Sequence, residues 1–133
     1  MNYLATLGAG IAYFVLGGLW FTPLFGRAWD SAVGFTRPPK WRPSLPYYLG
    51  PLVGCQVIAI AIAVLLNISK ASTLAQSLQV GVVVGLGVSA TVTAVNAISP
   101  NVPRPALYAV VVGGYHLIGA LLCTAIIYYI GAA

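Results

Sequence analysis

The chain has 133 residues, of which 60% are hydrophobic and only 5% are charged. A soluble domain has about 25% charged residues, so this chain cannot cover itself with a surface that faces water. Six Lys and Arg residues stand against a single acid, Asp30, for a net charge of +5. One carboxylate excludes the carboxylate pair that general acid–base catalysis often uses, so we expect no catalytic residues and no enzyme.

The charged residues divide the sequence into four long uncharged runs, 1–26, 43–69, 71–103 and 105–133. Each run is longer than the roughly 20 residues that an α-helix needs to cross the hydrocarbon layer. Because lipid offers no hydrogen-bond partner to the backbone, these runs should be helical. The sequence therefore predicts an all-α polytopic membrane protein, a single transmembrane domain over residues 1–133 with four helices in an antiparallel bundle. The helices are expected at about 3–25, 47–68, 74–98 and 106–130.

The first helix should be retained rather than cleaved, since it lacks a basic n-region and its apolar part is too long for a signal peptide. It ends in an interfacial motif that contains Trp20, Pro23, Gly26 and Trp29. Pro23 has no N–H, so the carbonyl oxygen of Leu19 needs another hydrogen-bond partner. An indole N–H or an interfacial water could provide it. An aromatic belt that only anchors the helix is the alternative.

The first loop, residues 26–46, is the only long connection. Residues 28–33 could form a short helix in the membrane interface, where Arg27 and Asp30 could pair. Loops one and three carry five of the six cations, and the opposite side carries only Lys70. The positive-inside rule then places both loops in the cytoplasm and both termini in the periplasm. Cations clustered beside a membrane suit anionic lipid headgroups, so no nucleic-acid partner is expected.

Small residues at four-residue steps predict the faces on which the helices pack. The third helix has such a stripe at Gly81, Gly85, Ser89 and Thr93, and the fourth has one that includes Gly113. In the second helix, Gly50 and Gly54 lie on a different face from the polar Gln56. Ordinary packing within the bundle accounts for these patterns, and contact of Gly50 and Gly54 with another protein stays open.

Three polar side chains are expected near the middle of the membrane, namely Gln56, Ser89 and His116. Each lies about ten residues, or roughly 15 Å, from the cytoplasmic end of its helix. Polar groups at this depth normally face the interior, so we expect His116 to hydrogen-bond Ser89 or Gln56. His116 could be structural, could lie on a proton or substrate path, or could ligate the metal of a haem or chlorophyll. No cofactor is otherwise predicted.

The two cysteines, Cys55 and Cys123, are expected at about 12 and 25 Å from the cytoplasmic ends of their helices. This difference in depth exceeds the reach of a disulfide. It also argues against a metal site that combines both thiols with His116. We therefore predict two unpaired thiols that fill apolar space, and no metal site.

Two motifs resemble a bacterial family of small four-helix membrane proteins, domain of unknown function 1761. The first is the segment Gly18-Leu19-Trp20-Phe21-Thr22-Pro23-Leu24-Phe25-Gly26-Arg27-Ala28-Trp29. The second is Arg104-Pro105 followed by Gly114-Tyr115-His116-Leu117-Ile118. The resemblance implies the four-helix architecture and a place in the bacterial inner membrane. It implies no activity.

The expected function is that of a non-catalytic integral membrane protein that acts through helix packing. It would be an accessory or scaffolding subunit of a larger energy-transducing or photosynthetic complex. The alternative is a homo-oligomeric channel, carrier or small-molecule binder that uses the polar site at the midplane. Its partners would be the lipid bilayer and either other membrane subunits or copies of itself.

Overall fold

The computed structural model describes residues 1–131, and all regular structure within them is helical. Four helical stretches are long and apolar enough to cross a membrane: Tyr3–Leu24, Pro46–Ile68, Leu74–Ala97 and Pro105–Gly131. Each bound differs from the expected one by no more than one residue. The predicted all-α fold with four spanning helices is thus confirmed.

Two of the four spans change helix type along their length. The first consists of α1 (Tyr3–Leu19) and a π-helical end, η1 (Trp20–Leu24). The third consists of α4 (Leu74–Val82), the π-helix η2 (Val83–Ala90) and α5 (Thr91–Ala97). A π-helix bonds each N–H to the carbonyl five residues back instead of four, so it shifts every later side chain around the helix axis.

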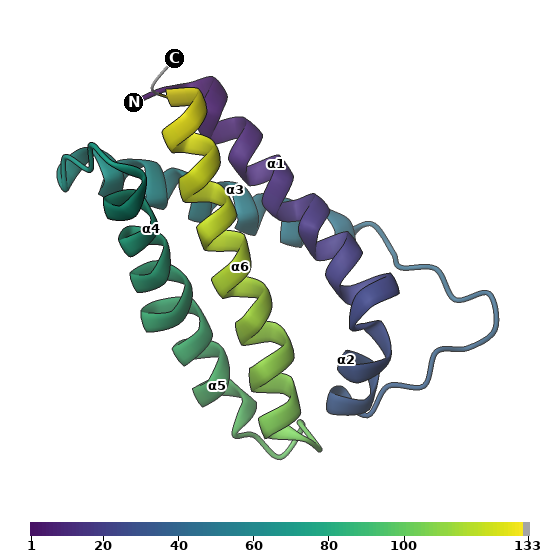
Figure 1. Ribbon diagram of the computed structural model, residues 1–133. Coiled ribbons are helices and arrows are strands. Elements are labelled where there is room, and N and C mark those ends of the chain that lie inside the picture. The colour runs from purple at the N-terminus through teal and green to yellow at the C-terminus, as the bar shows by residue number, and fades with distance from the viewer. Residues whose placement is uncertain (132–133) are drawn as a thin grey trace.

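The last helix, α6 (Pro105–Gly131), occupies the centre of the fold. It packs against α1 on one side and against α4, η2 and α5 on the other (Figure 1). Half of its most apolar stretch is buried, a larger share than in any other span. Backbones approach closely along both contacts because glycines lie at the crossing points.

The second span, α3 (Pro46–Ile68), packs mainly on α1. Figure 1 shows it passing behind α1 and α6 at a steep angle. All of its buried residues lie at or beyond Cys55, and nearly all of its first nine residues are exposed. Only the second half of α3 therefore belongs to the core.

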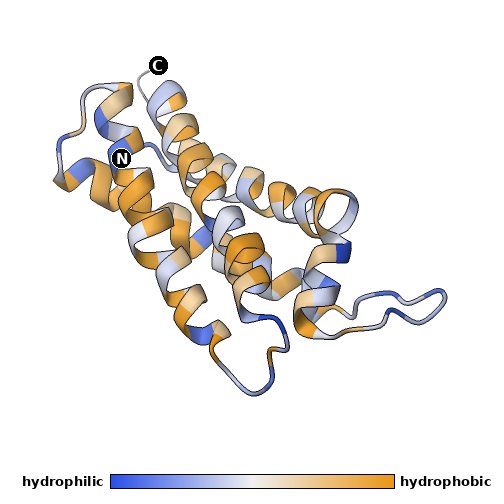
Figure 2. Cartoon of the chain, turned by 60° about the horizontal axis from the view of Figure 1, so that its bottom comes forward, coloured by the Kyte–Doolittle hydropathy of each residue, from blue (hydrophilic) through white to orange (hydrophobic). Residues whose placement is uncertain are grey.

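The outer surfaces of the helices are apolar, as contact with lipid requires. Figure 2 shows hydrophobic residues over most of each helix, with hydrophilic residues gathered largely in the connections. Large apolar side chains such as Leu4 and Val110 are 80% and 72% exposed. Such a surface would be unstable in water, but it is compatible with a bilayer.

The first loop begins with the predicted short helix, α2 (Gly26–Val33), which Gly34 ends in the left-handed conformation (φ 70°). The ion pair that Asp30 makes differs from the one expected. Its Oδ2 accepts a hydrogen bond from Nε of Arg37 at 2.6 Å, not from Arg27. Arg37 also donates to the carbonyl oxygen of Phe21, so it ties the returning loop to the end of the first span.

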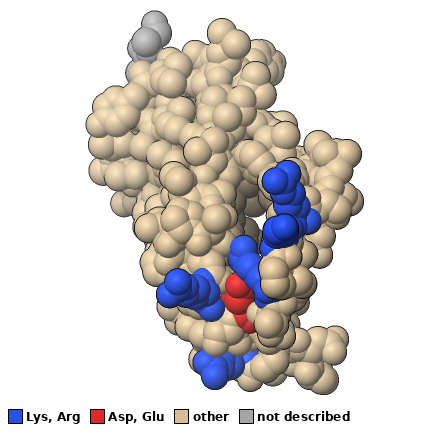
Figure 3. Space-filling model, turned by 90° about the vertical axis from the view of Figure 1, so that its right-hand side faces the viewer, with Lys and Arg blue, Asp and Glu red and all other residues tan. Residues whose placement is uncertain are grey.

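The first and third loops meet at the same end of the molecule. The backbone N–H of Arg104 donates to the carbonyl oxygen of Ala32, and its guanidinium donates to Oγ of Ser31 at 2.8 Å. Figure 3 shows the Lys and Arg side chains of this region around the single acid, away from the end with the C-terminus. One end of the fold thus carries most of the positive charge.

Candidate functional site

Five polar side chains are brought together in the apolar interior between α1, α3 and α6. We call them the core polar cluster: Tyr13, Cys55, Tyr115, His116 and Cys123. Tyr13 is fully buried, with its ring against Gly119 of α6 and its hydroxyl 2.7 Å from Nδ1 of His116. Polar groups at this depth are stable only when they find such partners.

The expected hydrogen bond from His116 to Ser89 or Gln56 is wrong, because Tyr13 takes that place. Gln56 instead donates its Nε2 to the carbonyl oxygen of Leu7, with its amide packed over Gly10. Among the described residues, the Ser89 side chain makes no hydrogen bond. The three residues predicted as a midplane site are therefore not linked to one another.

The hydroxyl of Tyr115 links α6 to α1 and to α3. It donates to the carbonyl oxygen of Tyr13 at 3.4 Å and lies 3.3 Å from Sγ of Cys55. The site of a Cβ on Gly17 would lie 2.9 Å from this hydroxyl, so a larger residue on α1 would push it away.

The two thiols lie in one hydrophobic core and are unpaired, as predicted. Cys123 donates to the carbonyl oxygen of Ala9, and Cys55 contacts Tyr115. Both cysteines are free thiols.

The side chains of the core polar cluster contact one another and the backbone through hydrogen bonds. Within residues 1–131, no group of three or more His, Cys, Asp or Glu side chains could hold a metal ion. Sequence reasoning misses Tyr13, since nothing in its spacing separates it from tyrosines that anchor a helix at the interface. Its position is fixed only by the crossing of α1 over Gly119.

The glycines Gly81, Gly85 and Gly113 lie where the third span meets α6. Positions for a Cβ on Gly81 and Gly85 would lie 2.8 Å from Thr124 Oγ1 and 2.9 Å from Leu117 Cα. Gly113 faces Ala90, not Ser89. The step from Gly85 to the next contact is thus five residues instead of four, as the π-helix η2 requires.

The interfacial motif closes the end of the first span onto α6. Trp20 donates its indole N–H to the carbonyl oxygen of Val111 at 2.9 Å, not to that of Leu19 within its own helix. Phe25 N–H bonds five residues back to Trp20, so the turn that contains Pro23 is a π turn. A Cβ on Gly26 would lie 2.7 Å from the carbonyl oxygen of Phe21, so only glycine fits. The Trp29 ring stacks edge-on against Phe21.

Replacing Trp20 with Phe should lower the free energy of unfolding by about 1 kcal/mol, because it removes the hydrogen bond from the indole N–H to the Val111 carbonyl oxygen. Unfolding of the purified protein in mixed detergent micelles measures this change. Trp29→Phe is the matched control, since Trp29 makes no side-chain hydrogen bond with the described residues. Equal losses in the two variants would mean that the Trp20 ring, and not its N–H, matters.

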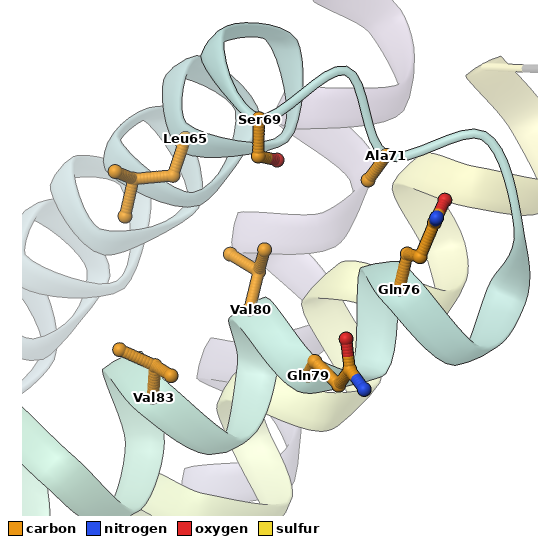
Figure 4. Close-up of a pocket in the computed structure, with 7 residues that line it drawn as sticks. All are labelled: Leu65, Ser69, Ala71, Gln76, Gln79, Val80 and Val83. Carbon is orange, nitrogen blue, oxygen red and sulfur yellow. The ribbon is translucent and has the colours of Figure 1, made fainter.

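An open groove of about 310 Å³ lies between the end of α3 and α4, apart from the core polar cluster (Figure 4). Its lining residues are Leu65, Ser69, Ala71, Gln76, Gln79, Val80 and Val83. Oε1 of Gln76 already accepts from the backbone N–H groups of Ser72 and Thr73 in a capping box. The groove is therefore the surface of a helix–turn–helix, with its polar groups partly used by the turn.

No curated protein and no solved structure matches this sequence. The family described as protein of unknown function (DUF1761) matches residues 4–128, which is nearly the whole chain. Both motifs that carry the resemblance lie inside this range, and the structure places them at packing contacts of the first span with α6. The chain belongs to the DUF1761 family.

Proposed function

We propose that this protein is a non-catalytic subunit that acts through helix packing, as an accessory or scaffolding part of a larger membrane complex. The observation that carries the proposal is that the first half of α3, residues 46–54, is exposed and packs on no other helix of the described chain. No atom lies within 4 Å of where a Cβ on Gly50 or Gly54 would be. Both glycines are exposed, and they lie in the half of α3 that packs on no other helix of the described chain.

Glycine inside a helix costs about 0.5–1 kcal/mol relative to alanine, and a close contact with another helix can offset this cost. Gly81, Gly85 and Gly119 each have such a contact on a neighbouring helix. Gly50 and Gly54 have none within the described chain. Spaced four residues apart, they suit the close approach of a helix from another membrane subunit.

The charged end of the fold supports one orientation in the membrane. We propose that the protein lies in a bacterial inner membrane with the first and third loops in the cytoplasm and both termini in the periplasm. Five of the six cations lie in those loops, which supports this orientation.

Native mass spectrometry from mild detergent tests the proposal. The wild-type chain should carry foreign subunits in fixed stoichiometry, and Gly50→Leu/Gly54→Leu should lose them while keeping its unfolding temperature. Gly18→Leu is the matched control, because Gly18 is equally open but lies on α1. A symmetric self-assembly that survives the double substitution would favour the homo-oligomeric channel or carrier, and a bare monomer would contradict both functions.

A further inference from the structure

The groove between the end of α3 and α4 has an apolar part with two walls and a floor. Leu65 on α3 faces Val80 and Val83 on the third span across the groove (Figure 4). Leu65 and Val83 are 41% and 61% exposed, and Val80 packs against the buried core. Because the outer surface of this protein is apolar and suits lipid, the apolar part of the groove is open to hydrocarbon chains.

The groove forms because α3 and the third span separate beyond the turn that joins them. Within the described chain, α3 packs on α4 but makes at most marginal contact with η2 and α5. Its steep path behind α1 and α6 carries it away from the rest of the third span (Figure 1). The turn thus closes one end of the groove, and the other end opens away from the turn.

The lining of the groove differs from a surface that receives another helix. Helices in membranes approach one another at small residues, as the third span and α6 do at Gly81 and Gly85. The apolar part of the groove presents leucine and valine side chains instead. Its volume of about 310 Å³ is typical of a site for a small molecule, whereas a helix with its side chains is about 10 Å across. A single flexible hydrocarbon chain fits this space better than a helix does.

The end of the groove beside the turn carries amide donors without partners. Oε1 of Gln76 accepts from the backbone N–H groups of Ser72 and Thr73, so its NH2 group points away from them. Neither this NH2 group nor the Gln79 amide makes a hydrogen bond with another residue in 1–131. Gln79 is five residues beyond the start of α4, or about 8 Å along its axis, so its side chain is close to the headgroup region. Donors at this depth suit the ester and phosphate oxygens of a lipid.

A positive charge is held at the same end of the groove. Lys70 stands between Ser69 and Ala71, which both line the groove. Its left-handed backbone conformation (φ 52°) fixes it in the tight turn directly after α3. The only Asp or Glu of the chain, Asp30, pairs with Arg37 at the other end of the molecule. Lys70 therefore has no acidic side chain of its own chain as a partner.

We propose that this groove binds one anionic phospholipid. An acyl chain lies between Leu65 and the two valines, and the free amide groups of Gln76 and Gln79 donate to ester or phosphate oxygens. Lys70 compensates the negative charge of the headgroup. A phospholipid offers hydrocarbon, oxygen acceptors and negative charge in the same order as the groove offers their complements. This site is apart from the glycine pair of α3 and does not depend on the proposed function.

The first test measures the preference for negative charge. The delipidated full chain is titrated with phosphatidylglycerol or with phosphatidylcholine of the same acyl chains, and native mass spectrometry gives the dissociation constant of the first lipid bound. Phosphatidylglycerol should bind about fivefold more tightly, which is the effect of one cation near the membrane surface. Lys70→Gln should remove this preference. Lys40→Gln is the matched control, because Lys40 is also exposed with a positive φ (63°) but lies in the first loop.

The lipid preference can contradict the proposal in two ways. If the wild-type chain binds both lipids equally, the groove does not recognise charge. If Lys40→Gln removes the preference and Lys70→Gln does not, the anionic lipid binds at the first loop and the assignment to the groove is wrong.

The second test locates the lipid. Phosphatidylglycerol with a diazirine in one acyl chain is activated by light in nanodiscs that contain the full chain, and the labelled residues are identified by peptide mass spectrometry. We expect adducts at Leu65, Val80 and Val83, which excess unlabelled phosphatidylglycerol removes more effectively than phosphatidylcholine does. Val83→Trp should fill the groove and abolish the adducts at the other two residues. Val82→Trp is the matched control, since Val82 is exposed but does not line the groove.

Two results of this experiment would overturn the proposal. Adducts spread evenly over the exposed helix faces would mean that the groove holds no particular lipid. A dimer of the wild-type chain that Val83→Trp breaks would mean that a second copy covers the groove. If Val83→Trp fails to fold, the adducts and the competition in the wild-type chain decide alone.

Discussion

Gly119→Ala should lower the free energy of unfolding by about 3 kcal/mol, an unusually large effect for one added methyl group. The new Cβ would fall inside the ring of Tyr13. That ring cannot move aside, since it is fully buried and its hydroxyl is bonded to His116. The helices α1 and α6 would have to separate, and the whole core polar cluster would loosen. Unfolding by sodium dodecyl sulfate in mixed micelles measures the loss.

A double-mutant cycle shows whether overlap with the Tyr13 ring causes the loss of stability in Gly119→Ala. In a Tyr13→Ala background the overlap is gone, so adding Gly119→Ala should then cost little. Gly54→Ala is the control for replacing a helix glycine as such, because nothing lies near that position. It should be neutral or stabilise by up to about 1 kcal/mol. A similar loss in Gly54→Ala and Gly119→Ala would contradict the packing argument.

Gly85→Ala should destabilise the protein by about 2 kcal/mol through the other face of α6. Its Cβ would lie 2.9 Å from Leu117 Cα and 3.1 Å from the carbonyl oxygen of His116. Both are backbone atoms, which cannot rotate away as a side chain can. The third span must therefore move outward as a body. The same micelle unfolding experiment measures the change.

The matched control for Gly85 lies two residues away in the same π-helix. Gly87 has no atom within 4 Å of its Cβ position, so Gly87→Ala should be neutral or slightly stabilising. Both substitutions change the local backbone preference in the same way. If Gly87→Ala were as destabilising as Gly85→Ala, the loss would come from the π-helical backbone and not from contact with α6.

The four spans could be predicted because hydropathy and charge act on each segment separately. A run without charges and longer than the bilayer is thick has one stable form, whatever its neighbours do. The short helix expected at residues 28–33, which the structure shows at Gly26–Val33, followed from its position beside the membrane in the same way. None of these predictions required information about which helices are in contact.

The contacts between helices could not be predicted from the sequence, because they depend on the type of helix as well as on the pattern of small residues. The π-helix η2 is an example. A regular α-helix carries Gly81, Gly85, Ser89 and Thr93 along one line, so Ser89 was expected to continue the packing stripe of the two glycines. The π-helix inserts one residue per turn, so Ala90 meets Gly113 in its place. Hydropathy is the same for both helix types, so the sequence pattern does not reveal the shift.

The oblique path of α3 explains why Gln56 does not meet His116. Depth was counted from the helix start, which holds only for helices that run parallel across the bilayer. Because α3 crosses α1 at an angle, Gln56 lies beside Leu7 of α1 and donates to its carbonyl oxygen. The angle at which a helix crosses its neighbours is a property of the assembled fold, and no local pattern encodes it.

The hydrogen bond from Asn2 to the carbonyl oxygen of Ile130, at 3.3 Å, places the start of α1 beside the end of α6. Two copies of the chain could therefore be fused in tandem through a short flexible linker, with no extra crossing of the bilayer to reverse the second copy. The same proximity would let the backbone be closed there and reopened in the first loop. A circularly permuted chain of that kind would keep every helix contact described above.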